Sequence, residues 1–278
     1  MVKLLTTKIQ FKTMKKILFV ALAMMMAIGG KAESEKRNVG EFSSVTMIGS
    51  YTVICTQGKD CSVVVEAPKE IAEQLQTEVK KGTLTISKKK IAGVNVISSD
   101  KADTEAIVYV TLPKLRNVTL VGTGNIQVKG KIECDEKLNV SLNGSGDIEM
   151  GDMEVNSSKF SLAGTGDIKV NSVKSAQVEM SLAGTGNMEF KKVDADKTTI
   201  NIAGSGDMRV GQVTASYLMV RKAGSGDLKI AGTTKIYNKM FAGSSKIDDS
   251  NLKYSKIGQI PSSQKMGSQS PNGIEAQP

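Results

Sequence analysis

The chain has 278 residues, 40% of them apolar and 23% charged, a balance that supports a packed core and excludes an intrinsically disordered chain. It contains no histidine, which excludes Ser-His-Asp triads, imidazole general bases and histidine-ligated zinc sites. Tryptophan is also absent, aromatic residues make up 4% of the chain, and 27 residues are glycine, a composition that favours turn-rich β structure over helical bundles.

Residues 1–32 have the pattern of a secretory signal peptide. Met14 and two lysines precede an apolar run over residues 17–28, which is too short to span a bilayer, and small residues follow up to Ala32. We expect cleavage after Ala32, and an N-terminal core helix is the alternative. The exported chain would then reside in the periplasm, at the cell surface or outside the cell.

Most of the positive charge belongs to this leader. Residues 1–32 contain six lysines and no acidic residue, so the formal charge of +9 falls to +3 when they are removed. A chain this close to neutral, with few aromatic side chains to stack on bases, shows no footprint of nucleic-acid binding. We therefore expect no nucleic-acid partner, and no transmembrane segment in the mature chain.

Residues 33–117 are predicted to form an irregular β-rich part that is continuous with the repeat that follows. The helix candidate covers residues 68–79, where apolar residues recur every four positions after a proline. Strand-like alternation is found in four segments, residues 41–54, 61–67, 82–88 and 106–112.

Cys55 and Cys61 lie on either side of a short polar turn between two of these strand-like runs. A hairpin of this kind brings two cysteines within bridging distance, and export permits oxidation, so the sequence predicts a disulfide. Two unpaired thiols on neighbouring strands are the alternative. Cys134 has no partner in the sequence and is expected to be buried.

A corner motif, Gly-Ser/Thr-Gly-Asp/Asn followed by Ile, Met or Leu, recurs about every 20 residues from residue 122 onwards. Apolar and polar residues alternate on both sides of each copy, which indicates two strands joined by a corner. A degraded seventh copy begins at Gly243. The first glycines of the six full copies are Gly122, Gly144, Gly164, Gly184, Gly204 and Gly224.

A unit of this length cannot bury its apolar face alone, so equivalent strands must stack on one another. The sequence therefore predicts an all-β fold, a right-handed parallel β-helix with about 20 residues per coil over residues 118–250. A β-sandwich is the alternative. Residues 251–278 are rich in Ser, Gln, Gly and Pro and are predicted to form a disordered tail.

The last position of the corner motif holds an acid or an asparagine in every full copy. In the stacked coils these side chains would form one column: Asn125, Asp147, Asp167, Asn187, Asp207 and Asp227. The first interpretation is structural, with each side chain bonded to the backbone amides of its own corner while glycine supplies positive φ angles. The functional alternative is a Ca²⁺ ion that bridges Asp147 with Asp167, or Asp207 with Asp227.

A second polar column stands on the outward face just before the corners. It consists of Ser141, Ser161, Ser181 and Asn201. Their hydroxyl and amide groups could hydrogen-bond a sugar chain, and the same pattern is expected of any solvated sheet face. These four residues are the candidate ligand-binding site.

Four segments upstream of the first corner also carry a recognisable pattern: Phe42-x-x-Val45, Val63 to Pro68, Gly82-Thr83-Leu84-Thr85-Ile86 and Leu112-Pro113-Lys114-Leu115-Arg116-Asn117-Val118. Together with the repeats, these segments resemble the bacterial family described as putative auto-transporter adhesin, head GIN domain. The resemblance covers about residues 38–250. It implies an exported right-handed β-helix related in shape to pectin lyases, without a recognised catalytic set, and a role in cell adhesion. The sequence shows no translocating barrel, so we do not expect the chain to secrete itself.

We therefore expect a non-catalytic binding or adhesion module of the cell envelope that presents its β-helix faces to a glycan or to an extracellular protein. Apart from the Ca²⁺ alternative, no cofactor is expected. One alternative is a carbohydrate-active enzyme on the same fold, but Arg209 and Arg221, the arginines of the repeat, lie on separate strands without an acid cluster. Another is a structural envelope component that assembles end to end through its stacked strands.

Overall fold

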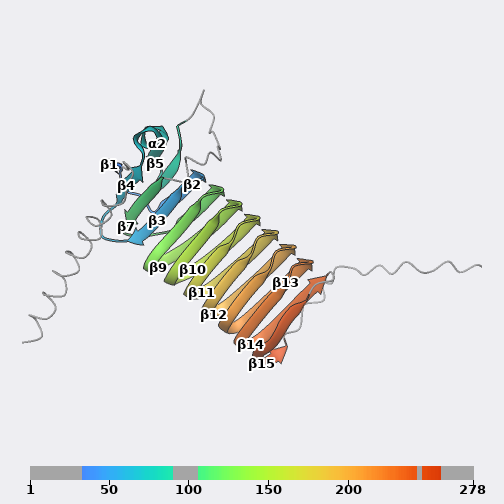
Figure 1. Ribbon diagram of the computed structural model, residues 1–278. Coiled ribbons are helices and arrows are strands. Elements are labelled where there is room, and N and C mark those ends of the chain that lie inside the picture. Colours follow the sequence, from blue (N-terminus) through green and yellow to red (C-terminus); the bar gives the residue numbers. More distant parts are fainter. Residues whose placement is uncertain (1–32, 90–105, 243–245, 258–278) are drawn as a thin grey trace, which may run out of the picture. The chain divides into compact units, whose positions relative to one another are not determined.

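The computed structural model describes residues 33–89, 106–242 and 246–257, and within these ranges the chain is almost entirely β-strand. The signal peptide predicted at residues 1–32, the degraded corner at 243–245 and the predicted tail beyond residue 257 lie outside these ranges. Figure 1 shows the coils stacked in chain order from β9 to β15. No helix in the described ranges is long and apolar enough to cross a membrane.

Each repeat unit forms one coil of a parallel β-solenoid. Neighbouring coils pair in parallel and in register, so that Ile148 lies against Ile168 and Phe160 against Met180. This pairing confirms the predicted parallel β-helix and excludes the β-sandwich. The five central strands each run almost from one corner to the next: β9 (Asn125–Gly144), β10 (Asp147–Gly164), β11 (Ile168–Gly184), β12 (Met188–Gly204) and β13 (Met208–Gly224).

The alternating sequence pattern places columns of apolar side chains inside the coils. Phe160 and Phe190 are both fully buried there and meet edge to face, with ring centroids 4.9 Å apart. Burial of these columns is the main driving force for stacking, because a single coil cannot remove its apolar face from water. The column that directly follows the corners is 0–1% exposed and consists of Ile126, Ile148, Ile168, Met188, Met208 and Leu228.

The next outward column alternates in charge over four coils, from Glu149 to Arg209, before Arg209 meets the like charge of Lys229. Glu149 pairs with Lys169, Lys169 with Glu189, and Glu189 with Arg209. Opposite charges on adjacent strands are favourable and like charges are unfavourable, so this column helps to hold the coils in register.

Two columns of glycine make the corners possible. The first glycine of each corner has a positive φ angle, +149° at Gly164, which favours glycine over residues with a side chain. The second has no room for a side chain, because a Cβ on Gly166 would collide with the backbone of Ser145 and Gly146 in the preceding corner. From residue 122 onwards, each corner can therefore stack closely on the preceding one only while both of its positions remain glycine.

The structure contains an additional coil that the motif search misses. It consists of β2 (Ser44–Gly49) and β3 (Thr52–Gln57), which stack on β8 (Asn117–Gly122) and β9. Gly49 lies opposite Gly122, but Tyr51 and Thr52 occupy the positions of the second glycine and the acid. The single strand-like segment predicted at residues 41–54 is therefore two strands separated by a corner.

The N-terminal end of the stack changes from parallel to antiparallel pairing. β6 and β7 pair in parallel with β2 and β3, and β5 and β4 then pair antiparallel with β6 and β7. β1 (Glu33–Arg37) lies next to β4 at the edge. The segments predicted at 61–67, 82–88 and 106–112 are confirmed as β4 (Ser62–Ala67), β6 (Thr83–Lys88) and β7 (Ile107–Leu112).

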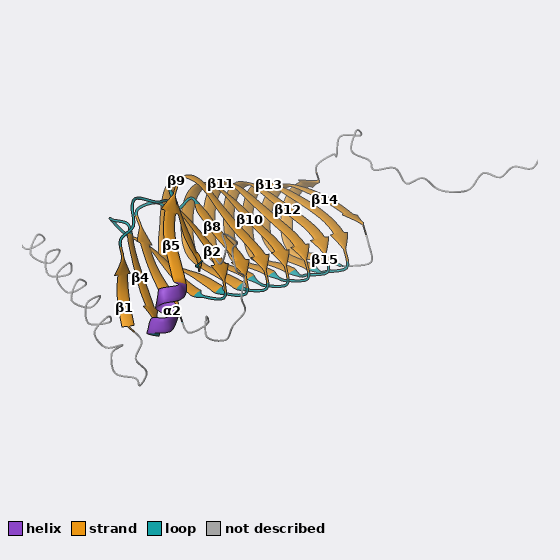
Figure 2. Ribbon diagram, turned by 90° about the horizontal axis from the view of Figure 1, so that it is seen from above, coloured by secondary structure: helices purple, strands orange, loops and turns teal. Residues whose placement is uncertain are grey.

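The helix predicted over residues 68–79 is correct only for its first half. The helix α2 spans Lys69–Gln74 and lies beside β4 and β5 (Figure 2), and Leu75 then begins β5 (Leu75–Lys80). The strand prevails because β5 forms a hairpin with β6 across Lys81 and Gly82. Their φ angles of +50° and +72° suit a tight two-residue turn.

The C-terminal end extends further than the sequence pattern indicates. The repeat is predicted to end at residue 250, but β15 continues seven residues further, to Ile257. Its second half is held because Leu252 is buried and Tyr254 packs on Tyr237, with ring centroids 5.4 Å apart. The last two strands are β14 (Leu228–Ala242) and β15 (Ile247–Ile257).

The predicted disulfide between Cys55 and Cys61 is not formed, and all three cysteines are free thiols. The prediction assumed that β3 and β4 form a hairpin, but β7 lies between them. Cys55 is fully buried, and burial raises the pKa of its thiol to about 12. Cys61 instead donates toward the Phe42 carbonyl and the Glu41 carboxylate. Cys134 is 8% exposed, in agreement with the predicted burial.

Candidate functional site

The acids of the corner motif form a ladder of hydrogen bonds between coils. The Asp147 Oδ1 atom accepts the backbone N–H of Asp167 at 3.0 Å, and the Asp167 Oδ1 atom accepts that of Asn187 at 3.1 Å. The pattern continues through Asp207 and Asp227, which accept from the next corner at 2.7 and 3.0 Å. Each side chain therefore bonds to the following coil, and the prediction that it bonds to its own corner is wrong.

The ladder explains why asparagine replaces aspartate in this column. The Asn187 Oδ1 atom accepts the Asp207 N–H at 3.1 Å, as an aspartate oxygen does at the other corners. The position therefore needs an acceptor oxygen and does not need a charge. Asn125 stands outside the ladder, because the Asp147 N–H donates to the Gly124 carbonyl.

No group of three or more Asp, Glu or Cys side chains in the described ranges is placed to hold a metal ion. Each of Asp147, Asp167, Asp207 and Asp227 already uses one oxygen in the ladder. Calcium binding at these pairs stays a hypothesis, which the metal arm of the binding experiment below tests.

Substitution of Asp167 separates the role of its oxygen from the role of its charge. We expect Asp167→Ala to lower the free energy of unfolding by about 1 kcal/mol, because the Asn187 N–H loses its acceptor. Asp167→Asn keeps an acceptor oxygen. Its loss in the free energy of unfolding is expected to be less than about half of the loss in Asp167→Ala. Urea denaturation of the two variants and the parent measures the difference. An equal loss in both variants would show that the charge matters, and would favour a bound cation.

The serine column lies where the sequence predicts it, on the outward face just before the corners. Ser141, Ser161, Ser181 and Asn201 are aligned in register along the solenoid and are half-buried between their neighbours. The Asn143 side-chain amide donates to the Ser141 hydroxyl at 3.2 Å. The four residues therefore share one face, as predicted. They line neither the groove of the next paragraph nor a smaller cavity of about 260 Å³ beside Asp207, Arg209 and Asp227.

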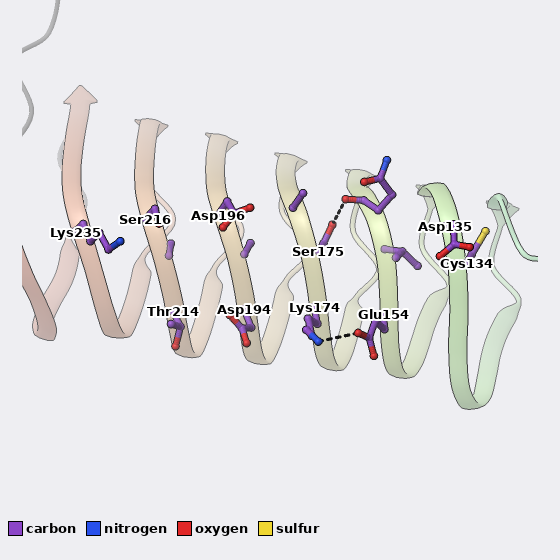
Figure 3. Close-up of a pocket in the computed structure, with 15 residues that line it drawn as sticks. Cys134, Asp135, Glu154, Lys174, Ser175, Asp194, Asp196, Thr214, Ser216 and Lys235 are labelled. Atoms are coloured by element: carbon purple, nitrogen blue, oxygen red, sulfur yellow. Dashed lines mark hydrogen bonds and ion pairs between the residues drawn. The ribbon is translucent and has the colours of Figure 1, made fainter.

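A groove of about 620 Å³ runs along a different face of the solenoid, across successive coils. Its floor is formed by buried residues near the middle of the five long strands β9 to β13, namely Cys134, Val155, Ser175, Ala195 and Ala215. Side chains before and after each floor residue form the two walls, which Figure 3 shows as two rows. Glu154, Lys174, Asp194 and Thr214 form one wall, and Asp135, Asn156, Ala176, Asp196, Ser216 and Lys235 form the other.

The N-terminal half of the groove contains a fixed ion-pair network. Lys174 bonds the Glu154 carboxylate at 2.8 Å, and Lys131 bonds the same carboxylate at 3.0 Å from the other side. These two ammonium groups lower the pKa of Glu154 to about 2, and the Glu154 carboxylate raises that of Lys174. Both groove side chains therefore stay charged over the physiological pH range.

Farther along, two carboxylates face each other across the floor. Asp194 is half-buried on one wall and Asp196 is exposed on the other, with Ala195 between them. Neither carboxylate makes a hydrogen bond or an ion pair with another described residue. The closest positive group on the same wall is Lys174, one coil earlier, whose ammonium interacts with Asp194 through space. This part of the groove has hydrogen-bonding capacity that the protein itself does not use.

The sequence pattern contains a signal for the groove that motif spacing does not reveal. In successive units a small residue, Ser175, Ala195 or Ala215, stands between two outward residues of the polar connection. The buried position is visible from the alternation, but the groove over it is not. The Asp194 and Asp196 pair is therefore a candidate that composition and spacing alone could not identify.

Comparisons with known proteins give a family and a fold. A model of the family described as putative auto-transporter adhesin, head GIN domain, matches residues 41–216. No curated protein matches the chain.

Several solved structures share the fold at low sequence identity. A putative lipid binding protein from Parabacteroides distasonis is 22% identical with a TM-score of 0.59, covering 83% of this chain and 98% of its own. A putative adhesin from Parabacteroides merdae is 16% identical with a TM-score of 0.62, and the match covers 81% of this chain and 97% of the adhesin. A putative adhesin from Bacteroides fragilis is 18% identical with a TM-score of 0.55, and the match covers 83% of this chain and 96% of the adhesin. Identities this low show a common fold and no more.

Proposed function

The chain belongs to the putative auto-transporter adhesin, head GIN domain family, and from that premise we propose that it is an exported, non-catalytic module that binds a glycan or a protein outside the cell. The observation that carries the proposal is the groove, whose volume of about 620 Å³ lies within the range of ordinary ligand sites. Its Asp194 and Asp196 side chains leave hydrogen-bonding groups free for a ligand. A rigid solenoid suits this role because it holds such groups at a fixed spacing.

The pKa shifts of Glu154 and Lys174 argue against a role for these two side chains as a general acid or a general base. A general acid needs a carboxyl group with a raised pKa, but the pKa of Glu154 is lowered by Lys174 and Lys131. A lysine base needs a lowered pKa, and that of Lys174 is raised by Glu154. Arg209 and Arg221, the arginines considered for a lyase, do not line the groove.

The lining of the groove also bears on the chemical class of ligand. One solved neighbour is named a putative lipid binding protein. Carboxylates, amines and hydroxyls form most of the walls in this chain, and such groups favour a polar ligand over an acyl chain.

A binding screen tests the proposal. The full chain, purified after export, is applied to a glycan array and to extracellular matrix proteins with Ca²⁺ and with EDTA, while the length of each polysaccharide is followed. We expect saturable binding without shortening of any polysaccharide. Shortened polysaccharide would show catalysis. Absence of binding to both the glycans and the matrix proteins would contradict the proposed binding function. Loss of binding in EDTA alone would support a Ca²⁺ ion at the corner acids.

A further inference from the structure

We propose that the groove is the ligand site of this module and that its ligand is an uncharged linear glycan, whose hydroxyl groups bond to Asp194 and Asp196. This inference rests on the proposed function and deepens it, since it names one face of the solenoid and one class of ligand. It differs from the site that the sequence predicts, which is the serine column.

The shape of the groove favours a linear ligand that runs along the solenoid. Its floor narrows to small side chains at three successive coils, Ser175, Ala195 and Ala215, each 7–8% exposed. Adjacent coils are about 4.8 Å apart, so these three positions span roughly 10 Å. Equivalent positions of the walls thus recur at intervals close to the length of one sugar unit in an extended chain, although different side chains occupy them. A compact ligand would use only one of these repeated positions.

The groove carries charged groups of both signs, and an uncharged polar ligand can form hydrogen bonds with both kinds. Among the side chains that line the groove are four carboxylates, of Asp135, Glu154, Asp194 and Asp196, and the ammonium groups of Lys174 and Lys235. An acidic polymer that filled the groove would meet the carboxylates in its middle. A basic peptide would meet Lys174 on one wall and Lys235 at the C-terminal end. Sugar hydroxyls both donate and accept hydrogen bonds, so one uncharged chain can satisfy both kinds of group.

The groups on the walls are arranged for hydrogen bonds and not for ring stacking. No aromatic side chain lines the groove. The Asp194 and Asp196 carboxylates are free to accept from hydroxyl groups on the two edges of a chain that lies over Ala195. Ser216, one coil further along the wall that carries Asp196, adds a hydroxyl. A bond from a neutral donor to a carboxylate is among the stronger hydrogen bonds of proteins, so this pair would anchor the ligand.

Two exposed alanines of one strand provide a test with a matched control. Ala176 lies on a wall of the groove, and Ala183, also in β11, lies on the outward face next to Ser181. We expect Ala176→Trp to block the groove and lower glycan affinity at least about tenfold, and Ala183→Trp to leave affinity unchanged. Calorimetric titration with cello-, manno-, xylo- and malto-oligosaccharides measures the affinities. Circular dichroism confirms that both variants keep their β structure.

Removal of single carboxylates tests the anchoring pair. Asp196→Ala is expected to lower affinity about tenfold, because a charge-assisted hydrogen bond to the ligand is lost. Glu149→Ala removes an equally exposed carboxylate from a neighbouring face and should have no effect. Oligogalacturonates, chitosan oligomers and oligolysine serve as charged probes, and each should bind more weakly than the best uncharged oligosaccharide.

The outcomes separate this inference from the function on which it rests. Loss of binding in Ala176→Trp but not in Ala183→Trp supports the groove. Loss of binding in Ala183→Trp but not in Ala176→Trp would place the ligand on the face of the serine column. The proposed binding function would then hold, and the proposal for the groove would be wrong. Tighter binding of a charged probe would overturn the choice of an uncharged glycan. If the parent chain binds neither sugars nor matrix proteins, both proposals fail.

Discussion

Gly166→Ala is expected to lower the free energy of unfolding by about 3 kcal/mol, although the change adds one methyl group. The added Cβ would collide with the backbone of Ser145 and Gly146 in the preceding corner, and backbone atoms cannot rotate away as a side chain can. Relief requires the two coils to separate locally, which lengthens the hydrogen bonds that join their corners. Urea denaturation followed by circular dichroism measures the loss.

Gly40→Ala is the control for this experiment. Apart from its two neighbours along the chain, no described residue has an atom within 4 Å of a Cβ built on Gly40, so the substitution should change stability by less than about 0.5 kcal/mol. A Gly166→Ala variant as stable as the Gly40→Ala variant would show that the corners can separate at little cost, and that their close stacking does not hold the coils together.

Phe160→Ala is expected to cost about 3–5 kcal/mol. Phe160 is fully buried, stacks in register with Val140 and Met180, and meets Phe190 edge to face. The neighbouring coils are fixed by their hydrogen bonds and cannot collapse into the space that the ring leaves. The loss therefore includes the cost of a cavity as well as the lost transfer of the ring from water.

Phe241→Ala provides the comparison, because the Phe241 side chain is 58% exposed at the C-terminal end. It is expected to change the urea midpoint little, while Phe160→Ala lowers it clearly. Similar midpoints for the two variants would mean that the interior of the solenoid repacks freely around a missing ring.

The regular part of the fold follows directly from the sequence, because one physical requirement repeats at each coil. Glycine at two corner positions and alternating apolar residues on both sides leave parallel stacking as the arrangement that keeps every column in register. Gly166 illustrates this, since its conformation and its neighbours are those of Gly146 and Gly186. The parallel stacking and the inward columns are accordingly predicted well.

The N-terminal part is less predictable because its order in the sheet differs from its order along the chain. β7 lies between β3 and β4, so two cysteines that look like hairpin partners are kept apart. Leu75 and Val79 have the spacing of a helical face, but pairing with β6 makes them part of a strand. The corner that begins at Gly49 is hard to recognise in the sequence, because Tyr51 stands where the repeats have their second glycine. Gly49 itself is in register with Gly122. Each of these structures is determined by pairing between strands that are far apart in the sequence. A local sequence pattern carries no information about such pairing.

The candidate site could likewise be predicted from the sequence only in part. The sequence places the corner acids in one column, but which amide each acid accepts depends on the rise from coil to coil. Asp167, for example, bonds to Asn187 in the next coil. The groove lies over Ala195, a small residue whose identity alone does not indicate a hollow surface. Sequence reasoning therefore identified polar columns and could not tell which face is hollow.

The separation along the chain between contacting residues sets the expected order of folding. Coils in the repeat are joined by contacts between residues 20 apart, such as Asp147 with Asp167. The N-terminal coil needs contacts across 73 residues, such as Ser50 with Thr123, so its loop closure costs more entropy. We expect one slow step in which β2 and β3 meet β8 and β9, followed by rapid addition of coils toward the C-terminus. This is the order in which synthesis delivers them, so each new coil meets a template that is already complete.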